Sequence, residues 1–203
     1  KDTRVNKTLF QFFRTFGDQG GKVGMSNLLI STCSEKLSER EFVFPIVEIV
    51  KPEDYEVLHY TECTEKDISK ASRIMICGTS LQDNSYLGDL NIFKNLLLGF
   101  EGPILGICSG MQIVCSLFED KLVENIEIGM IEVRTLESNE LCEGKFQAYS
   151  IHNFSVDNLE FFTILARSDT SVQAIKHKSR KIFGVSFHPE VRNEEIVENF
   201  LRV

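Results

Sequence analysis

Apolar runs alternate with helix-like stretches along the first half of the chain. Four runs predict buried strands: Asn27 to Cys33, Tyr55 to Tyr60, Arg73 to Cys77 and Pro103 to Ile107. Between the first two, Ser38 to Val50 has helical spacing that Pro45 must kink or shorten. Strands joined by crossovers of this length pair in parallel, so we expect an α/β sheet covered on both faces.

The second half of the chain has a different pattern, with short β-rich segments separated by turn residues. We expect strands at Ile126 to Thr135, Gly144 to Ser150, Phe161 to Ala166, Ser171 to Lys176 and Lys181 to Phe187. A closing helix is expected from Glu194 to Leu201. The predicted fold class is therefore α/β, with a mostly parallel central sheet and a mixed or antiparallel extension in the second half.

Residues 1 to 24 differ in pattern from the rest of the chain. Apolar residues from Val5 to Phe16 recur at near-helical spacing, and a glycine-rich break from Gly17 to Gly24 follows. We expect an N-terminal extension that forms a partner-binding or packing helix, or an ordinary surface helix. Residues 25 to 203 are expected to form a single domain.

Charge and cysteine usage narrow the functional classes. The chain of 203 residues has a net charge of −8, which opposes binding to nucleic acid or to anionic membranes. No apolar segment is long enough to span a bilayer and no leader opens the chain, so we expect a cytoplasmic protein. The six cysteines are scattered, without the spacing of a disulfide framework or a metal site, and no cofactor is expected.

The sequence GPILGICSGMQIV, from Gly102 to Val114, predicts a strand, a sharp turn and a helix. Cys108 lies at the turn, with Gly106 two residues before it and Gly110 two residues after it. Small residues at these offsets let strand and helix approach closely around a strained nucleophile. A helix N-terminus also favours a thiolate over a thiol. We interpret Cys108 as a nucleophile; the alternative is a packing cysteine at the end of a core strand.

A cysteine nucleophile needs a base, and the base needs an orienting partner. The segment GVSFHPEV, from Gly184 to Val191, ends a predicted strand with His188 and then Glu190. Pro189 denies a helix to His188 and holds the two side chains in a rigid turn. We expect the carboxylate to bind one imidazole nitrogen while the other nitrogen faces Cys108; taken alone, His188 would more often be a structural hydrogen-bonding residue.

With both segments present, the chain resembles the class I, triad-type glutamine amidotransferases, from roughly Met25 to Val203. The motifs that carry the resemblance are the GxCxGxQ turn at Gly106 to Gln112 and the His-Pro-Glu turn at 188 to 190. The resemblance implies a flavodoxin-like amidotransferase architecture. It also implies a catalytic triad of Cys108, His188 and Glu190.

The resemblance further implies an oxyanion hole formed by the backbone N–H groups of Gly78 and Ser109. The family commonly has Gly-Gly-Pro where this chain has Gly78, Thr79 and Ser80, which predicts a less rigid loop. The stretch from Ser150 to Asp157 resembles the family's substrate loop. The implied substrate-binding residues are Gln112, His152, Asn153 and Phe154, whereas Ile151 stands where a polar residue is usual.

The implied activity is hydrolysis of L-glutamine to glutamate and ammonia. The sequence contains no recognisable ATP-binding loop, so ammonia would pass to a separate synthetase subunit. Three segments near the C-terminus, ILARSDT, AIKH and FHPEV, are similar to those of the amidotransferase subunits of GMP synthetases. Two alternatives are a γ-glutamyl or peptide hydrolase of the same fold, and a non-catalytic regulatory module that retains the triad.

Overall fold

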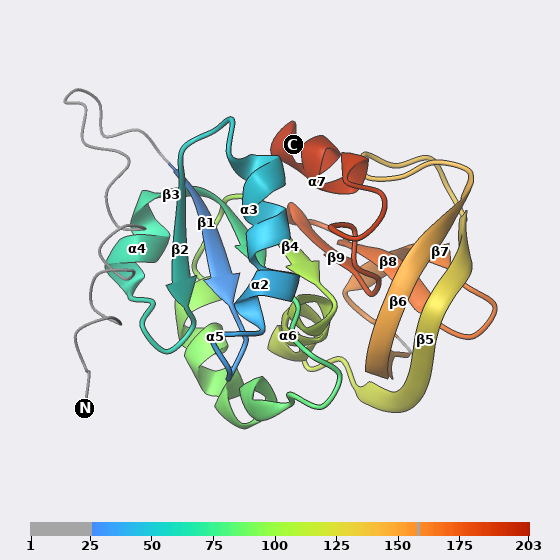
Figure 1. Cartoon of the computed structure of the whole chain (residues 1–203), viewed down its shortest axis with the longest axis horizontal. Coiled ribbons are helices and arrows are strands. Elements are labelled where there is room, and N and C mark those ends of the chain that lie inside the picture. Colours follow the sequence, from blue (N-terminus) through green and yellow to red (C-terminus); the bar gives the residue numbers. More distant parts are fainter. Residues whose placement is uncertain (1–25, 158) are drawn as a thin grey trace.

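The computed structural model describes residues 26–157 and 159–203, and the predicted N-terminal helix lies outside these residues. A nine-stranded sheet runs through the described chain (Figure 1). Five of its strands are parallel, in the spatial order β2 (Tyr55–His59), β1 (Ser26–Ser31), β3 (Ala71–Ile76), β4 (Ile104–Ile107) and β9 (Ile182–Val185). The parallel half therefore contains the four predicted strands and gains β9.

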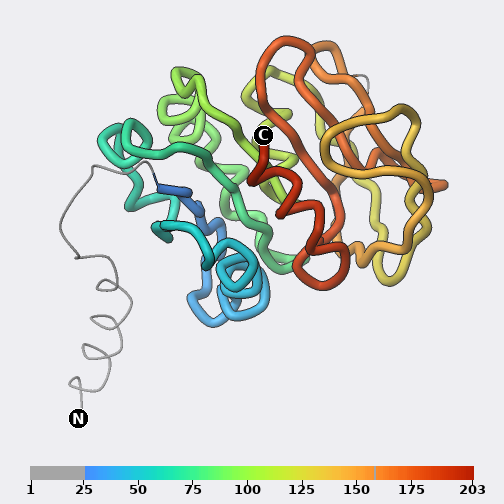
Figure 2. Tube along the Cα trace, turned by 90° about the horizontal axis from the view of Figure 1, so that it is seen from above, coloured from blue at the N-terminus to red at the C-terminus, as the bar shows by residue number. Residues whose placement is uncertain are grey.

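The other half of the sheet is antiparallel. It continues from β9 through β8 (Val172–His177), β7 (Phe162–Arg167), β5 (Leu122–Thr135) and β6 (Lys145–Val156). Seen from above, these yellow and orange segments gather at one end of the molecule, and the blue and green parallel half lies at the other (Figure 2). The predicted combination of a parallel sheet with an antiparallel extension is confirmed.

The helices cover both faces of the parallel strands. They are α2 (Glu39–Phe42), α3 (Phe44–Val50), α4 (Glu65–Lys70), the 3-10 helix η1 (Ser85–Asp89), α5 (Leu90–Leu97), α6 (Ser109–Leu117) and α7 (Glu195–Leu201). One hydrophobic core joins α2, α3 and α7 to one sheet face, and a second joins α4, α5 and α6 to the other. Burial on both faces explains why the parallel strands are continuous apolar runs.

Pro45 has the predicted effect on the first helical segment. Its missing N–H and fixed φ angle suit the first turn of a helix, and the segment divides into α2 and α3 at Val43, just before it. The antiparallel strands β5 and β6 are both longer than predicted, with 14 and 12 residues. As a result, Ser150 to Val156, expected to form a substrate loop, belong to strand β6; that expectation was wrong.

Candidate active site

Cys108 occupies a strained turn between β4 and α6. Its backbone angles are φ 51° and ψ −107°, in a region that residues with a side chain rarely adopt. Such a conformation costs on the order of 1–3 kcal/mol and persists only when the surrounding structure enforces it. A hydrogen bond of 2.8 Å from the Cys108 N–H to the Val185 carbonyl helps to hold the turn against β9. The thiol is thereby fixed at the carboxyl end of two neighbouring parallel strands.

The two glycines that flank Cys108 are required by the close packing of the turn. A Cβ atom added to Gly106 would lie 2.3 Å from the carbonyl oxygen of Gly110. A Cβ added to Gly110 would lie 2.2 Å from the carbonyl oxygen of Ile76 in β3. Both neighbours are backbone atoms, so no side-chain rotation relieves the clash. The glycine spacing in the sequence therefore reflects direct contact among strand, turn and helix.

His188 and Glu190 form a buried pair just beyond the end of β9. The imidazole Nδ1 lies 2.7 Å from Glu190 Oε1, and the two side chains are 1% and 0% exposed. The His188 N–H donates to the Tyr149 carbonyl of β6 over 2.8 Å, which ties the turn to the antiparallel half. The expected pairing of carboxylate and imidazole is present, with one ring nitrogen engaged by the carboxylate.

Cys108 and His188 meet around Gly78. A Cβ atom built on Gly78 would lie 2.8 Å from His188 Cε1 and 3.4 Å from Cys108 Cβ. The two residues are distant in the sequence, but β4 and β9 are adjacent parallel strands with Ile107 paired to Val185, so both side chains follow the same sheet edge. This pairing explains why residues from two separate motifs share one site.

The electrostatics of His188 reflect its neighbours. Complete burial lowers the pKa of the imidazole, but the charges and hydrogen bonds of Cys108 and Glu190 outweigh burial and raise it well above its usual value. Nε2 has no standard hydrogen bond within the described residues, so it is not held by a competing partner. The arrangement stabilises an imidazolium next to the sulfur of Cys108.

The residues of the expected oxyanion hole lie on two adjoining loops. Ser109 is the first residue of α6, so its N–H is one of the donors that a helix start leaves without an intrahelical partner. Its hydroxyl contacts Thr32 Oγ1 at 3.0 Å and donates to the Cys77 carbonyl at 3.3 Å. Cys77 directly precedes Gly78, so this carbonyl links the start of α6 to the loop that carries the second expected donor.

Hydrogen bonds fasten the loop that follows Gly78 to neighbouring segments. Thr79 Oγ1 and the Ser34 N–H both donate to Asp83 Oδ2, each over 2.7 Å. Partial burial raises the pKa of Asp83, but the hydrogen bonds from Ser34 and Thr79 outweigh it and lower the pKa. Asn153 Nδ2 donates to the Leu81 carbonyl over 3.0 Å, which joins the loop to β6. Thr79 therefore supplies a tether at the position where the family commonly has proline or glycine.

Gln112 is buried at the base of the site. Its Oε1 accepts a hydrogen bond of 2.5 Å from the Tyr86 hydroxyl, and its Nε2 donates to the Phe154 carbonyl over 3.3 Å. Tyr86 was not predicted as a site residue, because its polar loop has no periodic pattern. Burial and then the charge of Cys108 raise the pKa of the Tyr86 hydroxyl, which places the phenol in the electrostatic environment of the site.

Strand β6 lines the site with its backbone and with alternate side chains. Cys108 Sγ lies 3.6 Å from the Ile151 carbonyl oxygen, and the Asn153 side chain reaches the Gly78 loop as described above. His152 belongs to the opposite face of β6. Its ring is buried, with Nε2 3.5 Å from Glu127 Oε2 and Nδ1 3.1 Å from the Asn125 carbonyl oxygen. Of the four expected substrate residues, His152 thus points away from Cys108.

Glu127 is the centre of a polar cluster inside the antiparallel half, and no sequence motif indicated it. Its carboxylate accepts hydrogen bonds from the side chains of Ser168, Thr170, Ser171 and Gln173. Burial raises the pKa of the carboxyl, but hydrogen bonds from His152 and three hydroxyl groups outweigh burial and lower the pKa to about 2. We call these six residues the Glu127 cluster; it supports His152, and through it β6, from behind.

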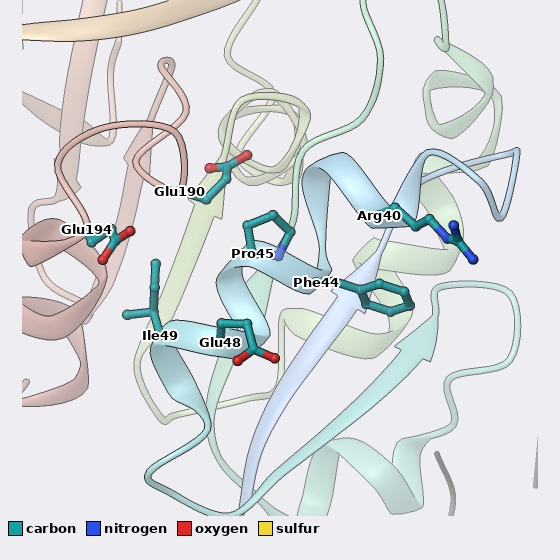
Figure 3. A pocket seen from close by; sticks show the side chains of 7 residues that line it. All are labelled: Arg40, Phe44, Pro45, Glu48, Ile49, Glu190 and Glu194. Atoms are coloured by element: carbon teal, nitrogen blue, oxygen red, sulfur yellow. The ribbon is translucent and has the colours of Figure 1, made fainter. Parts of the chain in front are cut away.

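A groove of about 480 Å³ on the α2–α3 side of the molecule is separate from the Cys108 site. It is lined by Arg40, Phe44, Pro45, Glu48, Ile49, Glu190 and Glu194 (Figure 3). The figure shows the Glu190 carboxylate pointing away from Pro45 and Glu48. Since neither Cys108 nor His188 lines it, we do not assign this groove to the substrate.

Neither a metal site nor a membrane-crossing helix is found among the described residues. Within residues 26–157 and 159–203, no group of three or more His, Cys, Asp or Glu side chains is arranged to hold a metal ion. In the same residues, no helix has the length and apolar character needed to cross a bilayer.

Comparison of the sequence with known proteins identifies related chains. The model of the family "Glutamine amidotransferase class-I" matches residues 47–202. The glutamine-hydrolysing subunit of GMP synthase from Methanosphaera stadtmanae is 39% identical over 121 residues, which cover 54% of this chain and 65% of that protein. The corresponding subunit from Pyrococcus abyssi is 39% identical over 110 residues, covering 51% and 58%. The matches thus span less than two thirds of these relatives.

Comparison of the structures gives the same fold. A candidate GMP synthase subunit from Thermoplasma acidophilum superposes with a TM-score of 0.76 at 22% identity, covering 88% of this chain and 93% of that one. A glutamine amidotransferase from Thermotoga maritima has a TM-score of 0.65 at 19% identity, covering 87% and 81%. At these identities the likeness concerns the fold alone. The family model, which matches more than half of the sequence, shows that this chain belongs to the class I glutamine amidotransferases.

Proposed function

We propose that this chain hydrolyses L-glutamine to glutamate and ammonia, with Cys108, His188 and Glu190 as the catalytic triad. The observation that carries the proposal is the meeting of a strained, glycine-flanked cysteine and a buried histidine–carboxylate pair around Gly78. Nucleophile, base and orienting carboxylate are the three parts that acyl transfer from an amide requires. The family membership agrees with this chemistry.

In the first half-reaction, His188 Nε2 takes the proton of the Cys108 thiol. The sulfur attacks the side-chain amide carbon of glutamine and forms a tetrahedral oxyanion. We assign the backbone N–H groups of Gly78 and Ser109 as its donors, each contributing about 3 kcal/mol to the lowering of the barrier. His188 then gives its proton to the amide nitrogen, the C–N bond breaks and ammonia leaves a γ-glutamyl thioester on Cys108.

In the second half-reaction, water restores the enzyme. His188, again neutral, accepts a proton from a water molecule whose oxygen attacks the thioester carbon. The intermediate collapses by breaking the C–S bond, the sulfur regains the proton from His188, and glutamate is released. Throughout, Glu190 at 2.7 Å keeps the imidazole oriented and stabilises its charged form.

For the substrate pocket, we propose Gln112, Asn153 and Phe154 near the reacting group. Gln112 is held by Tyr86, and Asn153 by the Leu81 carbonyl, so both are fixed before substrate arrives. We assign His152 a supporting part only, because its ring contacts Glu127 on the other face of β6.

The relatives are named as the glutamine-hydrolysing subunit of GMP synthase, which suggests the use of the ammonia. We propose that this chain, too, passes ammonia to a separate synthetase subunit, and that the acceptor reaction is the synthesis of GMP. The names of these relatives and the similar C-terminal segments support this finer assignment.

The decisive experiment measures ammonia release from L-glutamine by the purified chain, alone and with its synthetase subunit. A glutamine-analogue electrophile should label Cys108, detected by mass spectrometry of the peptide. Cys108→Ala should abolish turnover and labelling while the thermal melting curve stays the same. Cys63→Ala is the matched control, because burial and two nearby carboxylates raise the pKa of the Cys63 thiol to about 11 and leave it unreactive.

Three outcomes would contradict the proposal. Ammonia release by the Cys108→Ala variant would refute the nucleophile assignment. An unlabelled Cys108, under conditions in which a known amidotransferase reacts, would favour a non-catalytic module. Faster cleavage of γ-glutamyl peptides than of glutamine, with no ammonia formed in the presence of the synthetase, would favour a hydrolase of the same fold.

A further inference from the structure

Strand β5 has an inverted pattern of exposure. Ile126, Ile128 and Met130 are 71%, 57% and 51% exposed, whereas Glu127, which lies between two of them, has a side chain only 10% exposed. A strand with one face on a core ordinarily buries its apolar residues and exposes its charges. Here the apolar side chains point outward and the carboxylate points into the protein.

The apolar side chains of β5 continue onto β6. The register pairs Ile128 with Ile151 and Met130 with Tyr149, and directly opposite residues of an antiparallel pair share a face. Tyr149 and Ile151 are half-buried. We call these residues, Ile126, Ile128, Met130, Tyr149 and Ile151, the β5–β6 apolar face. An exposed cluster of this kind marks an interaction surface more often than a scattered apolar residue does.

The face is maintained by a costly arrangement. Burying a carboxylate is unfavourable unless several donors satisfy it, and Glu127 receives hydrogen bonds from four side chains of β8 and the turn before it. An irregularity in the β5–β6 pairing, between Glu124 and Glu127, sets the register. A slip by one residue would turn the isoleucines inward and expose Glu127. The outward direction of the apolar residues is therefore specified by the fold.

The face borders the Cys108 site. The Ile151 carbonyl oxygen lies 3.6 Å from Cys108 Sγ, and the Tyr149 carbonyl accepts the His188 N–H. Strand β6 is the last strand of the sheet, at the end of the molecule that Figure 1 shows beside β5. A protein seated on the face would consequently stand beside the place where ammonia is formed.

We propose that the β5–β6 apolar face is the docking surface for the synthetase subunit that receives the ammonia. This inference rests on the proposed function. Ammonia released into water is protonated and no longer nucleophilic, so its acceptor must sit against the site and exclude solvent. A second copy of this chain on the same face would shield the site without using the ammonia. Charged residues at one end of the face, Glu132, Arg134 and Lys145, supply the polar rim that protein interfaces have.

The test uses the full chain and the purified synthetase subunit of GMP synthase from the same organism. Ile128→Glu and Met130→Glu, combined, place two charges in the face without touching the residues assigned to catalysis. We expect the Kd for the synthetase to rise at least tenfold, and glutamine-dependent product formation to fall in parallel. Product formation from added ammonium chloride should stay unchanged, and so should the melting curve of the variant chain.

The matched control is Leu98→Glu. Leu98 is 38% exposed and follows α5 at the opposite end of the sheet from Cys108, so this charge should leave binding unchanged. The inference is overturned if the synthetase fails to bind the wild-type chain, or binds the face variant as tightly as the wild type. It is also overturned if sedimentation shows a wild-type dimer that the face variant dissociates, because the face then joins two copies.

The two proposals fail in different ways. If the wild-type chain binds the synthetase through this face but yields no ammonia from glutamine, the proposed activity is wrong and the docking surface stands. If glutamine hydrolysis is present and both variants bind and transfer ammonia like the wild type, the activity stands and the docking surface is wrong.

Discussion

Substitution of Glu127 by glutamine is the sharpest test of how the antiparallel half is held together. The carboxylate accepts hydrogen bonds from Ser168, Ser171 and Gln173 at 2.8, 2.9 and 2.6 Å. Glutamine has nearly the same shape, but one oxygen becomes an NH₂ group that faces donors. The substitution therefore removes the charge and part of the hydrogen bonding with little change in volume.

The magnitude follows from the pKa of the carboxyl group. Its ordinary value is 4.5 and its value in the folded protein is about 2. Because the folded-state pKa is lowered, ionisation stabilises the folded protein above pH 4.5, and this stabilisation is lost as the pH falls towards 2. The difference corresponds to about 3 kcal/mol at pH 7 and about 1 kcal/mol at pH 3. The side chain is only 10% exposed, so solvent screens little of this energy.

The assay is urea unfolding of the wild type and of Glu127→Gln at several pH values. The difference between their free energies of unfolding cancels the other titrating groups. We expect it to be on the order of 3 kcal/mol at pH 7 and to shrink below pH 4.5. Glu132→Gln, on the same strand but on the exposed face, is the control and should show no comparable trend. A Glu127→Gln difference near zero at pH 7, or one that does not change with pH, would refute the reasoning.

Three further predictions address the site. Glu190→Gln should lower kcat for ammonia release by about 10²–10⁴-fold, because the imidazole loses the anion that orients it; an unchanged kcat would exclude the assigned role. Thr79→Val removes the 2.7 Å bond to Asp83 and should lower kcat about tenfold while KM and the melting temperature change little, whereas an equal loss in a general unfolding assay would indicate a merely structural role. Gly110→Ala forces a Cβ to within 2.2 Å of a β3 carbonyl and should cost about 3 kcal/mol or more in urea unfolding, while Gly99→Ala, where a Cβ meets nothing within 4 Å, should not.

The nucleophile turn and the helix break at Pro45 were predictable because their signals are local. Gly106, Cys108 and Gly110 lie within five residues, and the clashes that require glycine occur within the same strand, turn and helix or with the next strand. Pro45 acts through its own missing N–H. The apolar runs of the parallel strands were equally clear, since burial on both faces leaves no polar alternation to confuse them.

The length of β6 was not predictable in the same way. Ser150 to Val156 mix polar and apolar residues, and they are extended because β5 pairs with them along the whole segment. The same pairing turns His152 away from Cys108 towards Glu127, against the expectation from the motif. Strand propensity depends on the partner strand and the neighbouring face, which a single segment does not contain.

By itself, then, the sequence determined the order of the elements, the turn at Cys108 and the pairing of His188 with Glu190, since each depends on residues close together in the chain. Only the tertiary structure decided the contacts between distant segments: Tyr86 with Gln112, and Asp83 with Ser34. The outward apolar residues of β5 belong to the same class. A buried carboxylate is tolerated only when the fold gathers its donors from other strands, and the fold alone brings those donors together.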